Sequence, residues 1–473
     1  MSAPDTPSAP GRRSARRRRR VDATMLLAVV LPLVVLLAVL AVRPGEELAT
    51  THPPTRTALT RSTVVCPSAA QDAPEVALTT AAADVDGSVR VGLGADQAEA
   101  DVVSGQVTTA DGGSGPLAVT GEDETAPGLV AARFGTQRPA AATCLPPRPD
   151  AWFTGVGSGA GHTSVLELTN PDAGTAVADV LVYGADGLVD APRLRGVSVP
   201  GGSSVQVDLA QVVPRRDELT LEVITARGRI GSTVVDSSDP VGRAPARTDW
   251  LPGQSEPSTT NLLMGLASGK DGRDVLTVAN GGPDEVRATV QIVTDRSVFT
   301  PKDAPDLRIP PQSTVRLVLS GALADLVRGD DATGLRVTST EPVTATLRTR
   351  AADDLSHTVP DPTVEGAATV LLPEVTSGSA AKTLLIAGAV RAGVVDVVTR
   401  SASGRELSSD RVEVAPDRGA SLELPTGAAL VTVTPSRTTV AGAVLVEDDG
   451  AAVVPLTVAP VDGLVPAVGP GLP

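Results

Sequence analysis

Hydrophobic and polar positions alternate in short runs over most of the chain, and turn residues separate the runs. The run 164–171, Ser-Val-Leu-Glu-Leu-Thr-Asn-Pro, places Leu166 and Leu168 on one face and Glu167 and Thr169 on the other. Successive side chains of a strand point to opposite faces. The pattern therefore predicts strands with Val and Leu on an inner face and polar residues on an outer one.

The order of these runs repeats along the chain with a period near 100 residues. The clearest units are 152–240 and 262–350, residues 370–458 follow more loosely, and residues 63–147 are interpreted as a degenerate first unit. About seven short strands per unit, 8–12 residues apart, is typical of a β-sandwich. The predicted fold class is all-β, with tandem immunoglobulin-like β-sandwich units after one N-terminal transmembrane helix.

Each unit is expected to bury its own alternating face and to fold independently, so that the units form a rod. Because the chain has only six aromatic residues, Val, Leu and Ala would fill the inner layers. Inner-face residues such as Leu168, Val180 and Val207 should then matter most for stability. Outer-face Glu167 should matter little.

The N-terminal segment predicts a membrane anchor. Residues 23–42 carry no charge and would form a helix of about 30 Å, the thickness of a bilayer's hydrocarbon core. Residues 1–22 hold seven Arg against Asp5 and Asp22, which predicts a cytoplasmic N-terminus and an extracellular C-terminal bulk. A signal peptide cleaved after residue 41 is the alternative, although the apolar run is long for one.

These observations divide the chain into seven segments. They are a cytoplasmic Arg-rich tail (1–22), a transmembrane helix (23–42), a stalk (43–62), a degenerate β-sandwich with a disulfide (63–147) and three further β-sandwiches (148–255, 256–355 and 365–473).

Cys66 and Cys144 are the two cysteines of the chain, and both follow the predicted span. On this topology they lie in an oxidising compartment, where two cysteines most simply form a disulfide. A catalytic thiol would need a nearby histidine, and no histidine lies between the two.

Composition excludes several function classes. Three His and two Cys make a zinc or iron–sulfur site improbable, and six aromatic residues offer little for stacking bases or sugars. The net charge of −15 opposes nucleic-acid binding. We therefore predict no cofactor, no metal and no nucleic-acid partner.

Three features raise a chemical question. The glycine-dense stretch 155–162 contains Ser158 and His162 but precedes a strand, so a flexible loop is favoured over a nucleotide site or a hydrolase elbow. His357 falls in a linker between units, where an ordinary histidine is favoured over a metal ligand. Acidic clusters, such as 447–449, are expected to be solvated turns, with calcium as the alternative.

Trp152 and Trp250 each stand just before a predicted unit. They are expected to fill the junctions between adjacent sandwiches. The alternative is that they form an exposed interaction site, because tryptophan is frequent in binding hot spots.

The repeated order Trp-Phe, Leu-x-Leu-x-Asn-Pro, an alternating strand ending in Gly, and Val-Pro-x-x-Ser is similar to the immunoglobulin-like units of secreted bacterial surface proteins. With the Arg block, the single span, the paired cysteines and only three Lys, the chain resembles an uncharacterised actinobacterial family of membrane-anchored envelope proteins. The resemblance implies no catalytic residues.

The predicted function is that of a non-enzymatic, membrane-anchored extracytoplasmic envelope protein, a scaffold or protein-interaction rod. The alternative is a cell-wall polysaccharide-binding or wall-processing accessory. Expected partners are the membrane, through one helix, and an envelope protein or cell-wall glycan.

Overall fold

The computed structural model describes residues 23–41, 54–70, 73–136, 138–216, 218–239, 246–267, 274–302, 304–329, 331–351, 354–374 and 380–465. The predicted tail 1–22 and residues 43–53 of the predicted stalk lie outside them. Contacts divide the chain into two compact parts, one of Met1–Thr55 with Leu464–Pro473 and one of Arg56–Gly463. We call Arg56–Gly463 the body.

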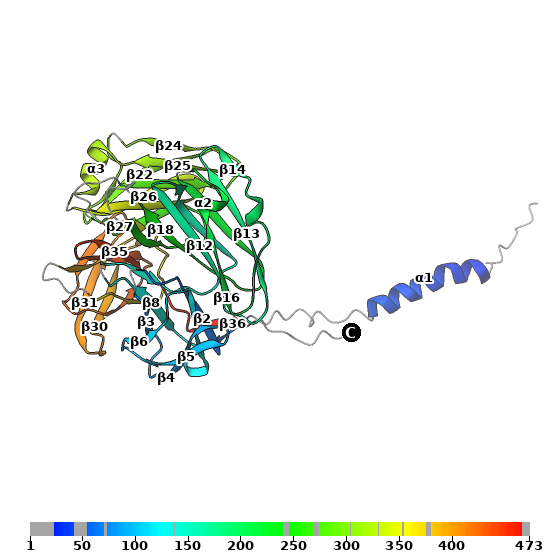
Figure 1. Ribbon diagram of the computed structural model, residues 1–473. Helices are drawn as coiled ribbons and strands as arrows, with labels where there is room; N and C mark the ends of the chain where they lie inside the picture. The colour runs from blue at the N-terminus through cyan, green and yellow to red at the C-terminus, as the bar shows by residue number, and fades with distance from the viewer. Residues whose placement is uncertain are drawn as a thin grey trace, which may run out of the picture. The chain divides into compact units, whose positions relative to one another are not determined.

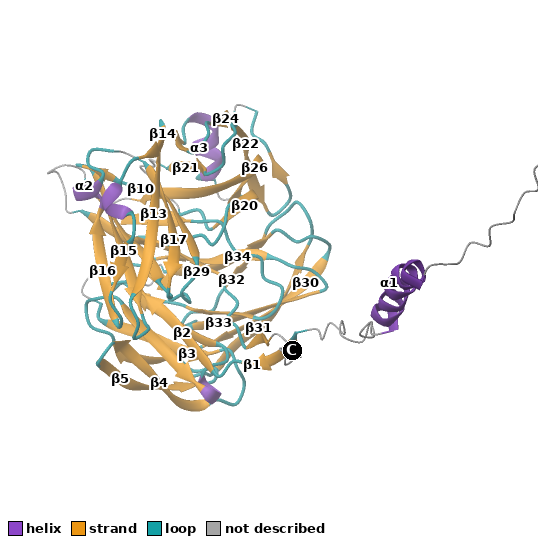
Figure 2. Cartoon of the chain, turned by 90° about the vertical axis from the view of Figure 1, so that its right-hand side faces the viewer, coloured by secondary structure: helices purple, strands orange, loops and turns teal. Residues whose placement is uncertain are grey.

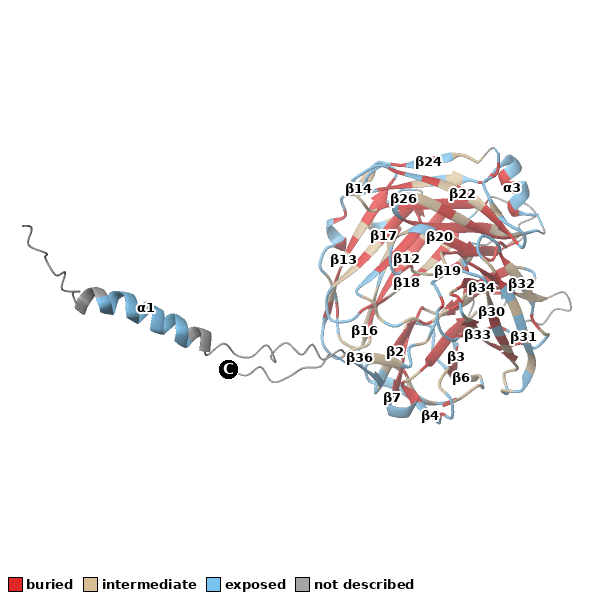
Figure 3. Ribbon diagram, turned by 180° about the vertical axis from the view of Figure 1, so that it is seen from behind, coloured by how far each residue is buried: buried red, intermediate tan, exposed pale blue. Residues whose placement is uncertain are grey.

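Helix α1 (Ala23–Ala41) coincides with the uncharged segment and contains Pro32. Its described side chains are exposed along residues 26–38, as the pale blue of Figure 3 shows. Within the described part of the chain, no helix reaches the length and apolar character needed to cross a bilayer. The predicted span 23–42 is therefore not confirmed.

The body is all-β, as predicted, and repeats one strand arrangement four times (Figures 1 and 2). We call the repeats modules 1 to 4. In modules 1, 2 and 4, the first, sixth, third and fourth main strands form one sheet in that order, and the fifth, second, seventh and eighth form the other. In module 3 one long strand, β26 (Ala332–Ala351), takes both the sixth and the seventh place, so that its strands are joined in one eight-stranded sheet. Auxiliary strands are added to this scheme in modules 2 and 3.

Modules 1 and 2 contain the following strands. Module 1 is built from β2 (Arg61–Cys66), β3 (Glu75–Thr80), β4 (Asp86–Leu93), β5 (Asp96–Val103), β6 (Thr108–Asp111), β7 (Leu117–Glu122), β8 (Leu129–Phe134) and β9 (Ala141–Thr143). Module 2 is built from β10 (Asp150–Val156), β11 (Ser158–Gly159), β12 (His162–Asn170), β13 (Ala176–Gly184), β14 (Gly187–Val189), β15 (Val197–Val199), β16 (Ser203–Asp208), β17 (Leu219–Arg227), β18 (Gly231–Ser238) and β19 (Arg247–Leu251), with the short helix α2 (Leu209–Val212).

Modules 3 and 4 continue the order. Module 3 is built from β20 (Ser258–Met264), β21 (Val275–Asn280), β22 (Val286–Thr294), β23 (Val298–Phe299), β24 (Asp306–Ile309), β25 (Ser313–Val318), β26 (Ala332–Ala351) and β27 (Asp354–Thr358), with helix α3 (Gly321–Val327). Module 4 is built from β28 (Ala368–Leu371), β29 (Ala381–Ala387), β30 (Gly393–Arg400), β31 (Glu406–Val414), β32 (Ala420–Glu423), β33 (Leu430–Ser436), β34 (Ala441–Glu447) and β35 (Ala451–Pro455). Strands β1 (Thr55–Ala58) and β36 (Asp462–Val465) pair with each other, so residues 55–58 of the predicted stalk form a strand.

Each module has its own hydrophobic core. Leu168 and Val180 are buried in the core of module 2, as the alternation predicts, and Val207 packs against it half-buried. Two buried asparagines end equivalent strands in the same way. The side-chain amides of Asn170 and Asn280 donate to the carbonyls of Gly174 and Asp284, both at 2.7 Å.

The modules contact one another in a closed cycle. The Trp250 indole of module 2 donates to the Ser68 carbonyl of module 1 at 2.9 Å, and the hydroxyls of Thr154 and Thr344 join modules 2 and 3 at 2.6 Å. Separate apolar clusters join module 3 to module 4 and module 4 to module 1. This differs from the predicted rod of independent units, because the four modules lie in one compact body.

The contacts between modules bury sheet faces that the alternating pattern of polar and apolar residues assigns to solvent. Glu167 is only 1% exposed, because module 1 covers the outer face of β12. Its carboxylate accepts hydrogen bonds from the Ser68 backbone at 2.9 Å, Gln206 at 2.9 Å and Thr233 at 3.0 Å. The expectation that Glu167 lies in solvent is wrong.

The predicted disulfide between Cys66 and Cys144 is present. It ties β2 to the segment that follows β9, across 78 residues of sequence. Both cysteines lie in the module 1 core, so the bridge joins the beginning and the end of this module.

Candidate functional site

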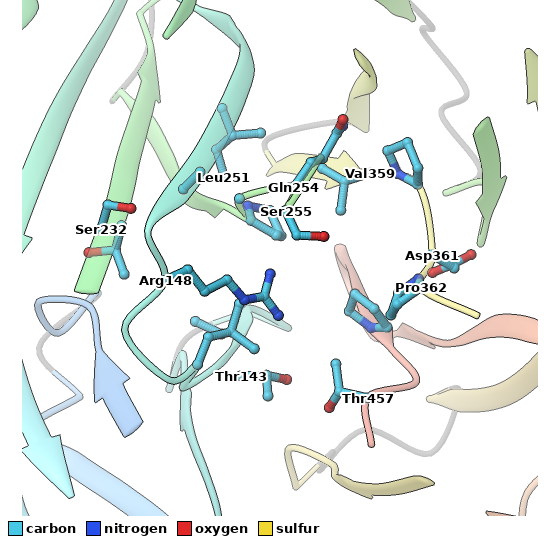
Figure 4. Close-up of a pocket in the computed structure, with 18 of the residues that line it drawn as sticks. Thr143, Arg148, Ser232, Leu251, Gln254, Ser255, Val359, Asp361, Pro362 and Thr457 are labelled. Atoms are coloured by element: carbon cyan, nitrogen blue, oxygen red, sulfur yellow. The ribbon is translucent and has the colours of Figure 1, made fainter. Parts of the chain in front are cut away.

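A cavity of about 290 Å³ lies where all four modules meet (Figure 4). Module 1 contributes Thr143, module 2 Ser232, and module 4 its last strand residue, Pro455. The segments that enter and leave module 3 contribute Gln254 and Pro362. The closed cycle of modules therefore creates a hollow that no single module could form.

Arg148 is the cation of this cavity. It lies in the connection between β9 and β10, and its backbone carbonyl is held by the Thr225 hydroxyl at 3.2 Å. The side chain projects into the cavity (Figure 4). Burial lowers the pKa of Arg148 from its usual value.

The Arg148 guanidinium forms no hydrogen bond or ion pair with any residue that the structure describes. Arg148 is half-buried, whereas two fully buried arginines of the body have partners: Arg348 binds Glu218, and Arg133 donates through Nη2 to the carbonyls of Gly112 and Gly113 at 3.0 Å each, although its Nε and Nη1 have none. A guanidinium has five N–H donors, and leaving them unpaired in a partly desolvated hollow is costly. An unpaired guanidinium in a cavity is what an anion-binding site requires.

The remaining wall is mostly neutral. Asp361 borders the cavity, and one of its carboxyl oxygens accepts from the Met264 backbone at 3.0 Å, whereas the other has no hydrogen-bond partner. Burial raises the pKa of Asp361 well above its ordinary range. Arg148 and Asp361 form no ion pair, and the charge of Arg148 remains available.

A second polar cluster fills the junction between modules 2 and 3. The bidentate pair of Arg348 and Glu218 has N–O distances of 2.6 and 3.0 Å. Arg348 also donates to Nδ1 of His162 at 2.9 Å, and Nε2 of His162 faces Asp236 at 2.9 Å. We call Glu218, Arg348, His162, Asp236, His357 and Asp249 the junction network.

The network continues through His357, whose ring lies 3.1 Å from Asp236 and 3.4 Å from Asp249. Burial opposes a charged ring, but hydrogen bonds to Asp236 and Asp249 raise the pKa of His357 to about 9. Burial likewise opposes ionisation of Asp236, but His162 and His357 hold its pKa well below the usual value. His357 is therefore a cation at neutral pH, paired with a buried carboxylate.

The junction network has the residue types of an acid–base catalyst but lacks access to a substrate. Its six side chains are at most 10% exposed. The Ser164 hydroxyl donates to Asp236, and the Ser158 hydroxyl donates to the Val213 carbonyl, so neither is activated by a histidine. A general base must reach its substrate, and these contacts instead fix modules 2 and 3 together.

Several sequence predictions fall at these two places. The stretch 155–162, expected to be a flexible loop, is an ordered hairpin in which β11 pairs with β12. His357, expected in a linker, lies in β27, because that strand extends module 3 against β19 of module 2. Both corrections have one cause, the burial of a module face by its neighbour.

Both tryptophans are buried at junctions. Trp152 is 6% exposed, stacks on Tyr183 with ring centroids 5.4 Å apart and borders Gly281 of module 3. Trp250 is 3% exposed and packs with Ala70, Ala140 and Ala142 of module 1. Trp250 also lines the central cavity.

Sequence reasoning missed Arg148. Little in the sequence points to this residue, because Pro-Pro-Arg-Pro is typical of an ordinary linker. Arg148 lies in the irregular connection between β9 and β10, and its side chain lines the cavity. In the described part of the chain, no group of three or more His, Cys, Asp or Glu is arranged to hold a metal ion.

Comparison with known proteins gives a family but no activity. No curated protein matches the chain. The model of a family described as "Family of unknown function (DUF5719)" matches residues 107–425, from module 1 into module 4. Because this match covers more than half of the chain, the protein belongs to the DUF5719 family.

Proposed function

We propose that this protein is a non-enzymatic, membrane-anchored protein of the extracytoplasmic cell envelope that acts by binding a ligand in its central cavity. The observation that carries the proposal is the unpaired Arg148 guanidinium inside a hollow lined by all four modules. A preformed cavity with few convergent polar groups is typical of a binding site.

The compartment is inferred from two features. The Cys66–Cys144 bridge favours an oxidising environment. Helix α1 presents exposed leucines and valines along residues 26–38, directly after an Arg-rich segment, and such a surface needs an apolar cover. A bilayer would supply that cover, and its anionic headgroups would attract the arginines.

We further infer that the modules are immunoglobulin-like β-sandwiches of an actinobacterial envelope family. Two packed antiparallel sheets with a shared core support the first inference, and the Arg-rich, Lys-poor composition supports the second. An envelope protein remains the favoured partner over a wall glycan, because the described cavity offers no open aromatic face. Trp250, which borders it, is 3% exposed.

The compartment is tested by fusing alkaline phosphatase after Pro473 and measuring its activity in intact cells, together with membrane fractionation. We expect an active fusion that stays in the membrane fraction. An inactive but intact fusion would contradict the extracytoplasmic placement, and release into the soluble fraction would contradict the anchor.

The binding role is tested by placing a photo-crosslinking amino acid at Ser255, on the cavity wall, or at Gln97, an exposed position on β5. Irradiation of intact cells should give a discrete adduct at Ser255 and none at Gln97. Identical behaviour at the two positions would contradict a binding function for the cavity.

A further inference from the structure

We infer that the central cavity takes a monocarboxylate with a small apolar body, whose carboxylate forms a bidentate pair with Arg148. The carboxylate could belong to a free acid or to the C-terminal residue of a peptide, and the chemistry of recognition is the same. This inference rests on the proposed binding function and names the class of ligand.

The charge of the site favours a carboxylate over a phosphate. One guanidinium matches one carboxylate through two parallel N–H···O bonds. A phosphate carries more charge and is usually held by several cations or by backbone amides at a helix N-terminus. Among the residues that the structure describes, the cavity wall has no basic side chain besides Arg148, and its polar groups are hydroxyls, amides and the carboxyls of Asp361 and Glu256.

The wall also selects against extended polyanions. Glu256 is exposed at the cavity and repels a second negative charge, and the protein as a whole carries a net charge of −15. Proline, valine and leucine side chains make up much of the remaining lining, including Pro252, Pro362 and Val359. A volume of about 290 Å³ suits a small apolar body beside the carboxylate.

The surroundings of Arg148 suit a binding group better than a structural one. Arg148 is half-buried in the cavity, has no partner among the described residues, and burial lowers its pKa, so pairing with an anion would compensate its lost hydration. A structural arginine would behave in the opposite way, because its removal would leave a partner unpaired. Replacing Arg148 by the apolar Met should therefore leave the melting temperature of the unliganded protein unchanged or raise it.

The test uses isothermal titration calorimetry on the purified protein with three probes: N-acetyl-Val-Pro as the free acid, the same dipeptide as its amide, and valerate. We compare the natural protein with Arg148→Met, Arg148→Lys and Arg308→Met, in which an exposed arginine of β24 is changed as the matched control. Binding of the free acid but not the amide is expected. Valerate binding as tightly as the dipeptide would assign the site to free acids, and tighter dipeptide binding would assign it to peptide C-termini.

Arg148→Met should weaken binding by about ten- to a hundredfold, the value of hydrogen bonds to a charged group. The affinity of Arg148→Lys should lie between those of the natural protein and Arg148→Met, because an ammonium keeps the charge but cannot form the bidentate pair. Arg308→Met should bind as tightly as the natural protein. Equal binding of acid and amide would overturn the carboxylate inference while leaving a binding cavity. No binding of any probe would overturn the carboxylate inference, and the crosslinking test at Ser255 would then decide whether the cavity binds another class of ligand. A lower melting temperature for unliganded Arg148→Met would overturn the inference by showing a structural role for Arg148.

Discussion

Two junctions of the body solve the same packing problem with opposite chemistry. Modules 3 and 4 meet through Leu262, Met264, Leu385 and Leu445 in an apolar cluster, whereas modules 2 and 3 meet through threonines and the junction network. Both surfaces are outer faces of sheets whose inner faces already form a module core. The cycle of modules therefore depends on what each sheet presents on its second face.

The two chemistries constrain the modules differently. Apolar contact is non-directional and tolerates small shifts. The junction network is directional, because each buried charge is stabilised only while its partner keeps the right distance. We infer that the polar junction fixes the relative orientation of modules 2 and 3, and that it is the more sensitive to single substitutions and to pH.

The largest effect is expected for Asp236→Ala, which removes the carboxylate shared by His162 and His357. Removing one partner of a buried ion pair should lower the free energy of unfolding by about 3–5 kcal/mol. Urea denaturation of a soluble fragment from residue 54 measures the loss. A loss below about 1 kcal/mol would contradict the role assigned to the polar junction.

A smaller loss is expected in the apolar junction. Met264 is fully buried between modules 3 and 4, and Met264→Ala should cost about 2–3 kcal/mol, near the lower end for truncating a buried methionine. The same urea experiment applies. Unlike Asp236→Ala, this variant should leave the pH dependence of stability unchanged. A change would contradict the inference that only the polar junction is sensitive to pH.

Glu167→Ala sharpens the comparison at the junction of modules 1 and 2. It leaves the donors of Ser68, Gln206 and Thr233 unpaired, so a loss of about 1–3 kcal/mol is expected. Glu99 on β5 is exposed, and Glu99→Ala should change stability by less than about 0.5 kcal/mol. Equal results for the two variants would mean that module 1 does not cover β12 in solution.

The smallest effect is a slope with pH. The folded pKa of His357, about 9, lies above its unfolded value, so its contribution is complete below about pH 6.5 and is lost as pH rises through 9. Between pH 7 and 8 the free energy of unfolding should fall by about 1 kcal/mol. His357→Gln should remove this slope. An unchanged slope would show that a group other than His357 causes the pH dependence.

The sequence predicts one of these junctions better than the other. Residues 262–264 and 384–387 are continuous apolar runs, which is the pattern of strands buried on both faces. By contrast, Thr344, Thr346 and Arg348 alternate with core residues in the way that solvent-facing positions do. A polar outer face looks the same in a sequence whether water or another module satisfies it.

The same limit explains the outcome for individual residues. Inner-face Leu168 and Val180 and the all-β class follow from the local alternation of polar and apolar residues, and the disulfide follows from the two cysteines of the chain, so all of these predictions are confirmed. Glu167 and His357 were misplaced, because their partners lie in another module. Arg148 could not be found from sequence, since its cavity exists only when all four modules are assembled.

The central claim is that the four modules close into one compact body. Small-angle X-ray scattering on the soluble fragment from residue 54 tests it most directly. A compact chain of this size has an expected radius of gyration of about 22 Å. The account predicts a value close to this, and a value of about twice that or more, as expected for modules arranged in an open rod, would contradict it.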